Sequence, residues 1–422
     1  MQDLARLSAT EVLRHIQNGR AGPMEWMEAC LESISARDGE RRAFAYFDAD
    51  AASRAASGAH PGPLAGMPIG VKDVLDTADM PSQYGSPIWQ GWRPRADSAA
   101  VAAARAAGAI VIGKTVTTEF ATRTPGPTTN PANAAHTPGG SSSGTAAGVA
   151  DYFFPVGFGT QTGGSIIRPA AYCGAVGYKP SFGSISRVGM KLMSDSLDTV
   201  GVMARSVADC ALFAGAVTGR DLGFPDAKPD RAPRIGMCKT FSWRHAAPET
   251  QALMENIAIA LSRGGATISE YDLPAHFAEL EVAHPIIMNH ESAHALGWER
   301  NNHRGQISAD LQEKLVVGLA HSETELEAAY AIFERTQAEF SSAMGELDIL
   351  VTPAAAGEAP RGIEWTGDPV FNYIWTSLHV PCVTVPAGTG PNGLPLGIQI
   401  VGRRGADRAV LAFARWVEAA LG

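Results

Sequence analysis

Residues 136–189 constrain the chain more than any other stretch, because two glycine-serine clusters frame an apolar segment there. The first cluster is GGSSSG at 139–144, the second is GGS at 163–165, and residues 153–158 between them are mainly apolar. Glycine lets a ligand approach backbone N–H groups closely, and serine supplies a hydroxyl nucleophile. Either cluster alone would suit an ordinary turn. The two together predict a serine-based active site.

The composition excludes several other classes of protein. The chain has 422 residues, enough for a substantial core, and a formal net charge of −9, which offers no basic field to nucleic acid or to an anionic membrane. No run approaches the roughly 18 apolar residues of a membrane span. The five scattered cysteines lack a C-x-x-C pair, which argues against a disulfide framework and a cysteine zinc site. We therefore expect a cytoplasmic protein.

The order of the predicted elements favours an α/β fold. A helix at 97–108 leads directly into a short apolar strand at 109–114, as in a layered α/β unit. The stretch 222–233, rich in Asp, Pro and Gly, is expected to be a linker inside one domain. That single domain would span 1–422 and comprise N-terminal helices (1–60), a core (61–217), a helical cap (218–345), and C-terminal strands with a closing helix (346–422).

Lys72 is the most unusual charged residue of the core region. Its neighbours are apolar: Ile69, Val71, Val74 and Leu75. Burying an ammonium group costs several kcal/mol unless it is paired. From the local sequence, Lys72 is either a buried functional amine or a lysine whose stem is covered while its head reaches solvent.

These segments together resemble the amidase signature family, which hydrolyses C–N bonds with a Ser-cisSer-Lys triad. Residues 64–73 (LAGMPIGVKD) resemble its lysine segment, and residues 380–386 (VPCVTVP) and 393–399 (GLPLGIQ) resemble its C-terminal strands. The spacing is closest to the malonamidase-like branch. The resemblance implies an α/β/α sandwich whose central mixed β-sheet is flanked by helices.

The resemblance also assigns catalytic roles. Ser165 matches the nucleophile, Ser141 the bridging serine after a cis bond with Gly140, and Lys72 the base. Burial would lower the pKa of Lys72 toward neutrality, which a base requires. The oxyanion hole would consist of backbone N–H groups at Ser165 and at the residues before it, Thr162, Gly163 and Gly164. This chemistry needs no metal and no cofactor.

Arg168 is the leading candidate for substrate recognition. It lies three residues after Ser165, so a helix would bring both to one face. Its guanidinium would hold a substrate carboxylate bidentately, or it would pair with an internal Asp or Glu. Further substrate contacts are predicted at Ser142, Gln161, Met190, Met193, Met288 and Trp375. Gln161 replaces an aspartate that many members carry.

The predicted function is hydrolysis of a small amide through an acyl-enzyme. The same triad would also suit a urethanase (carbamate hydrolase) or an aryl acylamidase. A different class is an amidotransferase component or adaptor, although the compact length and acidic charge favour a free-standing enzyme. A homodimer is expected, but no residue identifies its interface.

Two rival motifs remain open. Residues 290–294 (HESAH) match the H-E-x-x-H motif of zinc peptidases, with His290 and His294 as ligands and a third ligand from Glu299, Glu313 or Glu323. Residues 140–144 match G-x-S-x-G, the nucleophile elbow of α/β-hydrolases. That elbow must follow a strand, and a loop rich in Pro, Asn and Thr precedes it here.

Overall fold

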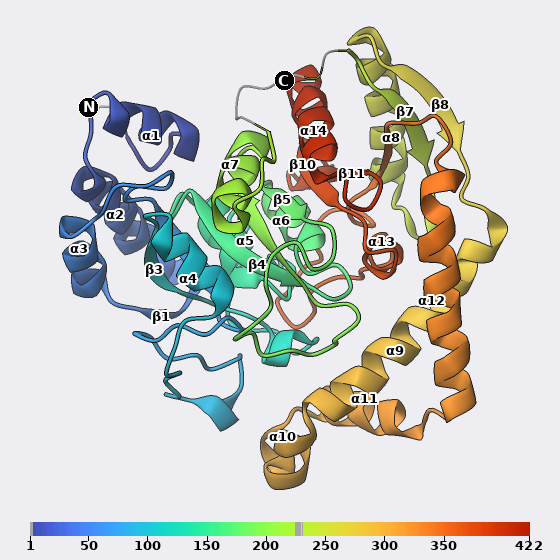
Figure 1. Ribbon diagram of the computed structural model, residues 1–422, viewed down its shortest axis with the longest axis horizontal. Helices are drawn as coiled ribbons and strands as arrows, with labels where there is room; N and C mark the ends of the chain where they lie inside the picture. Colours follow the sequence, from blue (N-terminus) through green and yellow to red (C-terminus); the bar gives the residue numbers. More distant parts are fainter. Residues whose placement is uncertain (1–2, 224–228, 230) are drawn as a thin grey trace.

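The computed structural model describes residues 3–223, 229 and 231–422 (Figure 1). Residues 224–228 and 230, which belong to the predicted linker at 222–233, lie outside the described residues. Within the described residues, eleven strands drawn from the whole length of the chain form one sheet.

The sheet is mixed, as predicted. Its strands in spatial order are β1 (Phe44–Phe47), β3 (Ile110–Thr115), β2 (Pro68–Lys72), β4 (Val156–Gln161), β6 (Thr199–Ala204), β5 (Val176–Lys179), β10 (Cys382–Thr389), β11 (Pro395–Val401), β9 (Ile349–Pro353), β7 (Arg234–Cys238) and β8 (Thr267–Tyr271). Strands β3, β2 and β4 run parallel, as do β9, β7 and β8. The pairings from β4 to β9 through the middle of the sheet are antiparallel.

Helices flank this sheet, which confirms the predicted fold class. One set consists of α4 (Ala99–Ala106), α7 (Val207–Thr218), α14 (Asp407–Leu421) and α8 (Pro248–Arg263), each in contact with the next. Helices α5 (Ser143–Ala150) and α6 (Ile167–Cys173) pack together and against the central strands. The short helix α13 (Tyr373–Ser377) precedes β10.

The N-terminal helices pack on the core. They are α1 (Ala9–Gln17), α2 (Pro23–Arg41) and α3 (Ala49–Ser57), at the blue end of Figure 1. Ser8 and Glu11 form a reciprocal capping box at the start of α1. The buried Asp209 of α7 accepts hydrogen bonds from the N–H groups of Ala9 and Thr10. These bonds satisfy donors that the first turn of a helix leaves open, and they fix α1 against α7.

The cap extends from one corner of the molecule (Figure 1). It consists of α9 (Leu280–Ala295), α10 (Gly297–Asn302), α11 (Ala309–Ala320) and α12 (Glu323–Ala343), and α9 contacts α11, α12 and α13. The expectation that 218–345 is a helical cap needs correction, because β7 and β8 in this range belong to the sheet. Strand β8 is a mostly exposed edge strand, so it lacks the apolar run by which a buried strand is recognised.

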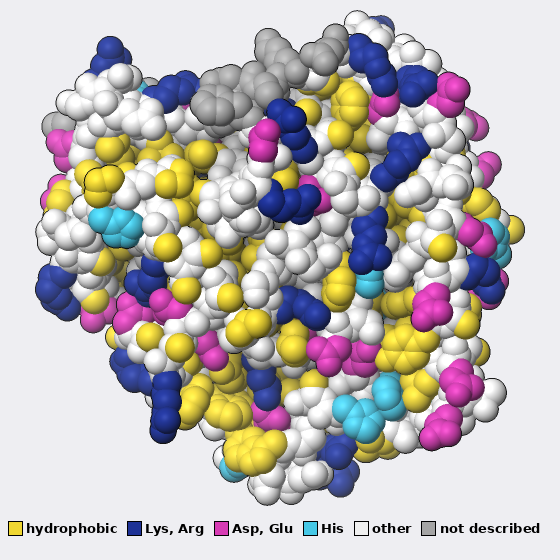
Figure 2. All heavy atoms as spheres, in the orientation of Figure 1, with side chains coloured by type: hydrophobic (Ala, Val, Ile, Leu, Met, Phe, Trp, Pro, Cys, Tyr) yellow, Lys and Arg dark blue, Asp and Glu magenta, His cyan; other side chains and the backbone are white. Residues whose placement is uncertain are grey.

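The surface mixes both signs of charge. On the face shown in Figure 2, acidic and basic side chains are interspersed. Among the described residues, no helix combines the length and the apolar character needed to cross a bilayer.

Candidate active site

The parallel pairing of β2 and β4 brings the predicted catalytic segments together. Val71 lies opposite Phe158, so the carboxyl ends of both strands meet at one edge of the sheet. Lys72 is the last residue of β2, and β4 leads into the loop 162–165 before α6. Ser141 lies just before α5, which packs on both strands.

Lys72 and Ser141 are in direct contact. The Lys72 Nζ lies 2.7 Å from the Ser141 Oγ and 2.7 Å from the Thr160 Oγ1. Both Lys72 and Ser141 are buried, and the Gly140–Ser141 peptide bond is cis. A neutral amine in this position can donate to one of these hydroxyls and accept from the other.

Burial controls the ionisation of Lys72. Desolvation lowers the pKa of its amine well below the usual value, and the negative charge of Asp198 opposes this shift only in part. Asp198 is buried and accepts hydrogen bonds from the Thr162 hydroxyl and from the Met193 and Ser194 N–H groups. The amine of Lys72 is therefore more readily neutral than that of an exposed lysine.

Gln161 organises the start of α6. Its Oε1 accepts hydrogen bonds from the N–H groups of Ile166 (2.9 Å) and Ile167 (3.0 Å). Its Nε2 donates to the Thr376 hydroxyl at 3.0 Å. Gln161 is fully buried, so it holds the loop from behind and does not face a ligand.

The carbonyl groups of the predicted oxyanion loop are held by side chains from other elements. The Thr376 hydroxyl donates to the Gly163 carbonyl at 2.8 Å, and the His284 Nε2 donates to the Thr162 carbonyl at 3.0 Å. Within the described residues, no group accepts a hydrogen bond from the N–H of Gly163, Gly164 or Ser165. These N–H groups are therefore available to a developing oxyanion.

His284 is neutral at physiological pH. Burial lowers the pKa of its imidazole to about 4, despite the hydrogen bond to Thr162. The neutral ring carries its proton on Nε2 and donates a hydrogen bond from there to the Thr162 carbonyl. This bond connects the cap helix α9 to the loop before Ser165.

A cavity of about 430 Å³ opens beside the loop. Its wall includes these predicted site residues: Thr162, Gly163, Gly164, Ser165, Arg168, Met193 and Met288. His284, Lys314 and the segment 365–370 complete much of the remainder. The half-buried Ser165 thus lines this cavity.

Arg168 faces the cavity with one nitrogen free. Its Nε donates to the Thr366 carbonyl at 2.9 Å, and its Nη2 donates to the Gly140 carbonyl at 2.8 Å. Its buried Nη1 has no hydrogen-bond partner among the described residues. Arg168 forms no ion pair with any described Asp or Glu, which removes the internal-pair alternative for the part of the chain that is described.

Four of the predicted substrate contacts do not line the cavity. The Ser142 hydroxyl bonds to the Thr160 backbone, and Gln161 holds the α6 start. Met190 forms a bridge with Leu75. Trp375 packs in the core against Phe340, with ring centroids 6.0 Å apart. Each of these side chains is buried, and the contacts given above are with other parts of the protein.

The structure also adds residues that the sequence did not single out. Thr160 and Asp198 surround the Lys72 amine, and His284 and Lys314 reach the cavity from the cap. The apolar context of Lys72 could have prompted a search for a nearby carboxylate such as Asp198. No local pattern marks His284 or Lys314.

The glutamates of the predicted zinc-peptidase site are bonded to other protein side chains. The His290 and His294 rings lie 4.5 Å apart, and Figure 2 shows histidines gathered over α9 and α11. Glu291, however, accepts hydrogen bonds from Ser194, Ser196 and Tyr330. Of the proposed third ligands, Glu299 is buried and bonded to Lys191 and Trp89. No three ligand side chains converge in the described chain.

The nucleophile-elbow interpretation is not supported either. Its central serine would be Ser142, which is fully buried and bonded to Thr160. The residues before Ser141 form a loop, whereas the elbow requires a strand.

Comparisons with known proteins agree with this geometry. The amidase family model matches residues 25–411. A glutamyl-tRNA(Gln) amidotransferase subunit from Salinispora arenicola (strain CNS-205) is 32% identical over 487 aligned positions, which cover 100% of this chain and 99% of the relative. An amidase crystal structure superposes with a TM-score of 0.90 at 29% identity, covering 99% of this chain and 100% of the other.

A second solved structure is a peptide amidase in complex with the competitive inhibitor chymostatin. It has a TM-score of 0.84 and 30% identity, covering 98% of this chain and 97% of the other. Since the family model covers most of the chain and the relatives match it almost end to end, the chain belongs to the amidase signature family and is an amidase.

Proposed function

We propose that this amidase hydrolyses a small amide through an acyl-enzyme on Ser165, with Ser141 as proton relay and Lys72 as base. The observation that carries the proposal is the 2.7 Å contact between the Lys72 Nζ and the Ser141 Oγ. It is supported by the desolvation of Lys72 and by the open N–H groups beside Ser165. The cis bond before Ser141 matches the resemblance on which the roles were assigned.

The proposed reaction moves one proton in a closed cycle. The Ser165 Oγ attacks the substrate carbonyl carbon while its proton passes to Ser141, whose own proton passes to Lys72. The N–H groups at 163–165 stabilise the oxyanion. The proton returns along the same relay to the leaving nitrogen as the C–N bond breaks. Water then attacks the ester on Ser165, using the same proton relay, and releases the carboxylic acid of the acyl group.

The substrate pocket favours an acidic acyl group. Arg168 lines the cavity and its buried Nη1 has no partner among the described residues, so a substrate carboxylate that reached it would complete its hydrogen bonding. This feature supports the malonamidase-like assignment. Met193 and Met288 make other parts of the wall apolar, which keeps carbamates and aryl amides as alternative substrates of the same triad.

The test is release of ammonia or amine from malonamate, an acyl anilide and an aryl carbamate. We expect Ser165→Ala to abolish turnover of whichever compound the wild type prefers, and a chelator to leave the wild type unaffected. Turnover that survives in Ser165→Ala would refute the nucleophile assignment. A preference for malonamate that Arg168→Met removes would support the acidic pocket.

A second candidate function is that of an amidotransferase component, which the names of the relatives favour. In that case the ammonia released at Ser165 would pass to an acceptor held by a partner chain. Co-purification of the tagged protein from its own cells tests this: a stoichiometric partner would support the amidotransferase, and a single species with hydrolase activity would support the free-standing enzyme. The same experiment, with light scattering, checks the predicted homodimer.

A further inference from the structure

A cationic cluster lines the part of the cavity formed by the cap. Lys314 projects from α11, and Arg123 follows the short helical turn Glu119–Ala121. Within the described chain, neither side chain forms a hydrogen bond or an ion pair. Arg123 is near enough to repel the charges of both Lys314 and Arg168. Three positive groups therefore surround one cavity.

Carboxylates near this cluster attract two of its cations without forming ion pairs with them. Asp310 acts on Lys314 and Asp368 on Arg168, and the carboxylates that line the cavity are Glu281 and Asp368. Glu281 accepts a hydrogen bond from Ser242 at 3.0 Å and belongs to α9, and neither carboxylate lies within ion-pair distance of the three cations. Like charges held together without direct ion pairs favour the binding of a ligand of opposite charge. The buried, unpartnered Nη1 of Arg168 independently indicates that the ligand is an anion.

The size of the cavity indicates a ligand longer than a three-carbon acid. About 430 Å³ lies within the range of pockets that hold drug-sized molecules. Arg168 follows Ser165 by three residues at the start of α6, so it would hold the carboxylate of a short monoamide. Lys314 and Arg123 come from other elements and would hold the carboxylate of a longer one.

We propose that Lys314 and Arg123 form a second anion subsite, which selects amides with a carboxylate several bonds beyond the scissile carbonyl. The subsite thus extends the substrate class to monoamides of dicarboxylic acids longer than malonate. The inference rests on the proposed amide hydrolysis at Ser165. It assigns Lys314, contributed by the cap, as a specificity-determining residue.

The experiment compares two series of primary amides of equal chain length, one ending in a carboxylate and one in a methyl group. We expect Lys314→Met to raise KM about 10- to 100-fold for the longer carboxylates and to leave kcat/KM of the neutral series unchanged. Lys314→Arg should restore most of the affinity. Lys239→Met, which removes a surface lysine outside the cavity, is the matched control.

A binding measurement provides a readout without turnover. Glutarate, as a probe of the product class, should bind the wild type by calorimetry and should bind Lys314→Met and Arg123→Met at least 10-fold more weakly. Equal effects of Lys314→Met on both amide series, or unchanged glutarate binding, would overturn the subsite. Turnover in Ser165→Ala would instead refute the underlying hydrolysis mechanism, so the two failures are distinguishable.

Discussion

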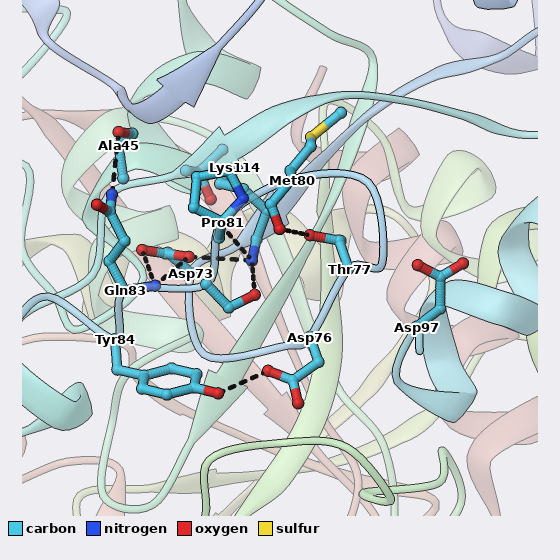
Figure 3. Close-up of polar contacts among 12 residues, drawn as sticks. Ala45, Asp73, Asp76, Thr77, Met80, Pro81, Gln83, Tyr84, Asp97 and Lys114 are labelled. Atoms are coloured by element: carbon cyan, nitrogen blue, oxygen red, sulfur yellow. Dashed lines mark hydrogen bonds and ion pairs between the residues drawn. The ribbon is translucent and has the colours of Figure 1, made fainter. Parts of the chain in front are cut away.

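Asp73 and Lys114 form an ion pair of 3.0 Å from which solvent is excluded, directly beyond the proposed base Lys72 (Figure 3). The Lys114 amine also donates to the Ser82 hydroxyl, and Asp73 accepts the Gln83 N–H. The pair thus connects the end of β2 to β3 and to the loop that follows. Two lysines on neighbouring strands therefore have opposite environments, since Lys114 has a carboxylate partner and Lys72 has hydroxyl partners.

Breaking this pair should destabilise the fold. In Lys114→Met the Asp73 carboxylate stays buried without its counter-ion, so we expect the free energy of unfolding to fall by about 3–5 kcal/mol. The double variant Asp73→Asn, Lys114→Met leaves no buried charge at the pair and should recover part of that loss. Urea unfolding of the three proteins measures the effect. A double variant less stable than Lys114→Met would contradict this account.

Replacing Lys72 should separate activity from stability. In Lys72→Met we expect turnover to fall by about 10²–10⁴-fold, because the base is removed, while the fold is retained. The pKa of Lys72 is lowered in the folded state, so the unfolded chain binds more protons and wild-type stability declines as pH falls below the usual lysine range.

The methionine variant lacks this dependence. Its stability relative to wild type should therefore be greater at pH 6 than at pH 9, as measured by denaturant unfolding at both values. A relative stability that instead increases with pH would show that Lys72 is charged in the folded protein.

Lys314 should give substrate affinity a pH dependence. Burial, with a contribution from Arg123, lowers the pKa of its amine to about 8. It is a cation below that pH and neutral above it, so KM for a long ω-carboxylate amide should rise as pH increases through 8. The other titratable groups facing this part of the cavity are Asp310, Arg123, Glu281, His284 and Asp368.

The variant Lys314→Arg distinguishes Lys314 from these neighbours. Arginine keeps its charge throughout this pH range, so the rise in KM should disappear while the neighbouring groups are unchanged. A rise that persists in Lys314→Arg would assign the effect to another residue.

Glu418 should make stability fall with increasing pH. It lies on α14 and accepts the Val207 N–H at 3.0 Å, and burial raises the pKa of its carboxyl to about 7. Between pH 4.5 and 7 the folded state holds a proton that the unfolded chain releases, so stability declines as pH rises. Glu418→Gln keeps the acceptor without the charge. The free energy of unfolding of this variant, relative to wild type, should increase by about 2 kcal/mol between pH 5 and pH 8. No increase would refute the raised pKa of Glu418.

Local sequence marked part of the proposed site. Ser141 and Ser165 belong to glycine-rich turns and Lys72 to an apolar strand end, so each carries a recognisable short pattern. The mixed sheet and its flanking helices followed from the family resemblance. Gln161 was predicted to contact substrate, but it holds the N–H groups of α6, a role that depends on how the chain turns after β4.

The remaining features depend on tertiary contacts. His284 and Lys314 come from cap helices more than 100 residues after the loop 162–165, and no motif in their surrounding sequence marks them as cavity residues. Trp375 was predicted to line an apolar pocket for the substrate, but its side chain is fully buried in the core. Strand β8 is exposed along most of its length and has no apolar pattern.

The central claim is that Ser165 carries the acyl group, and intact-protein mass spectrometry tests it most directly. The wild type would be quenched in acid during steady-state turnover of its preferred amide, alongside Ser165→Ala and Lys72→Met. We predict a mass increase equal to the acyl group in the wild type, localised by peptide mapping to Ser165 and missing from Ser165→Ala. An adduct on another residue, or one that persists in Ser165→Ala, would contradict the proposed mechanism.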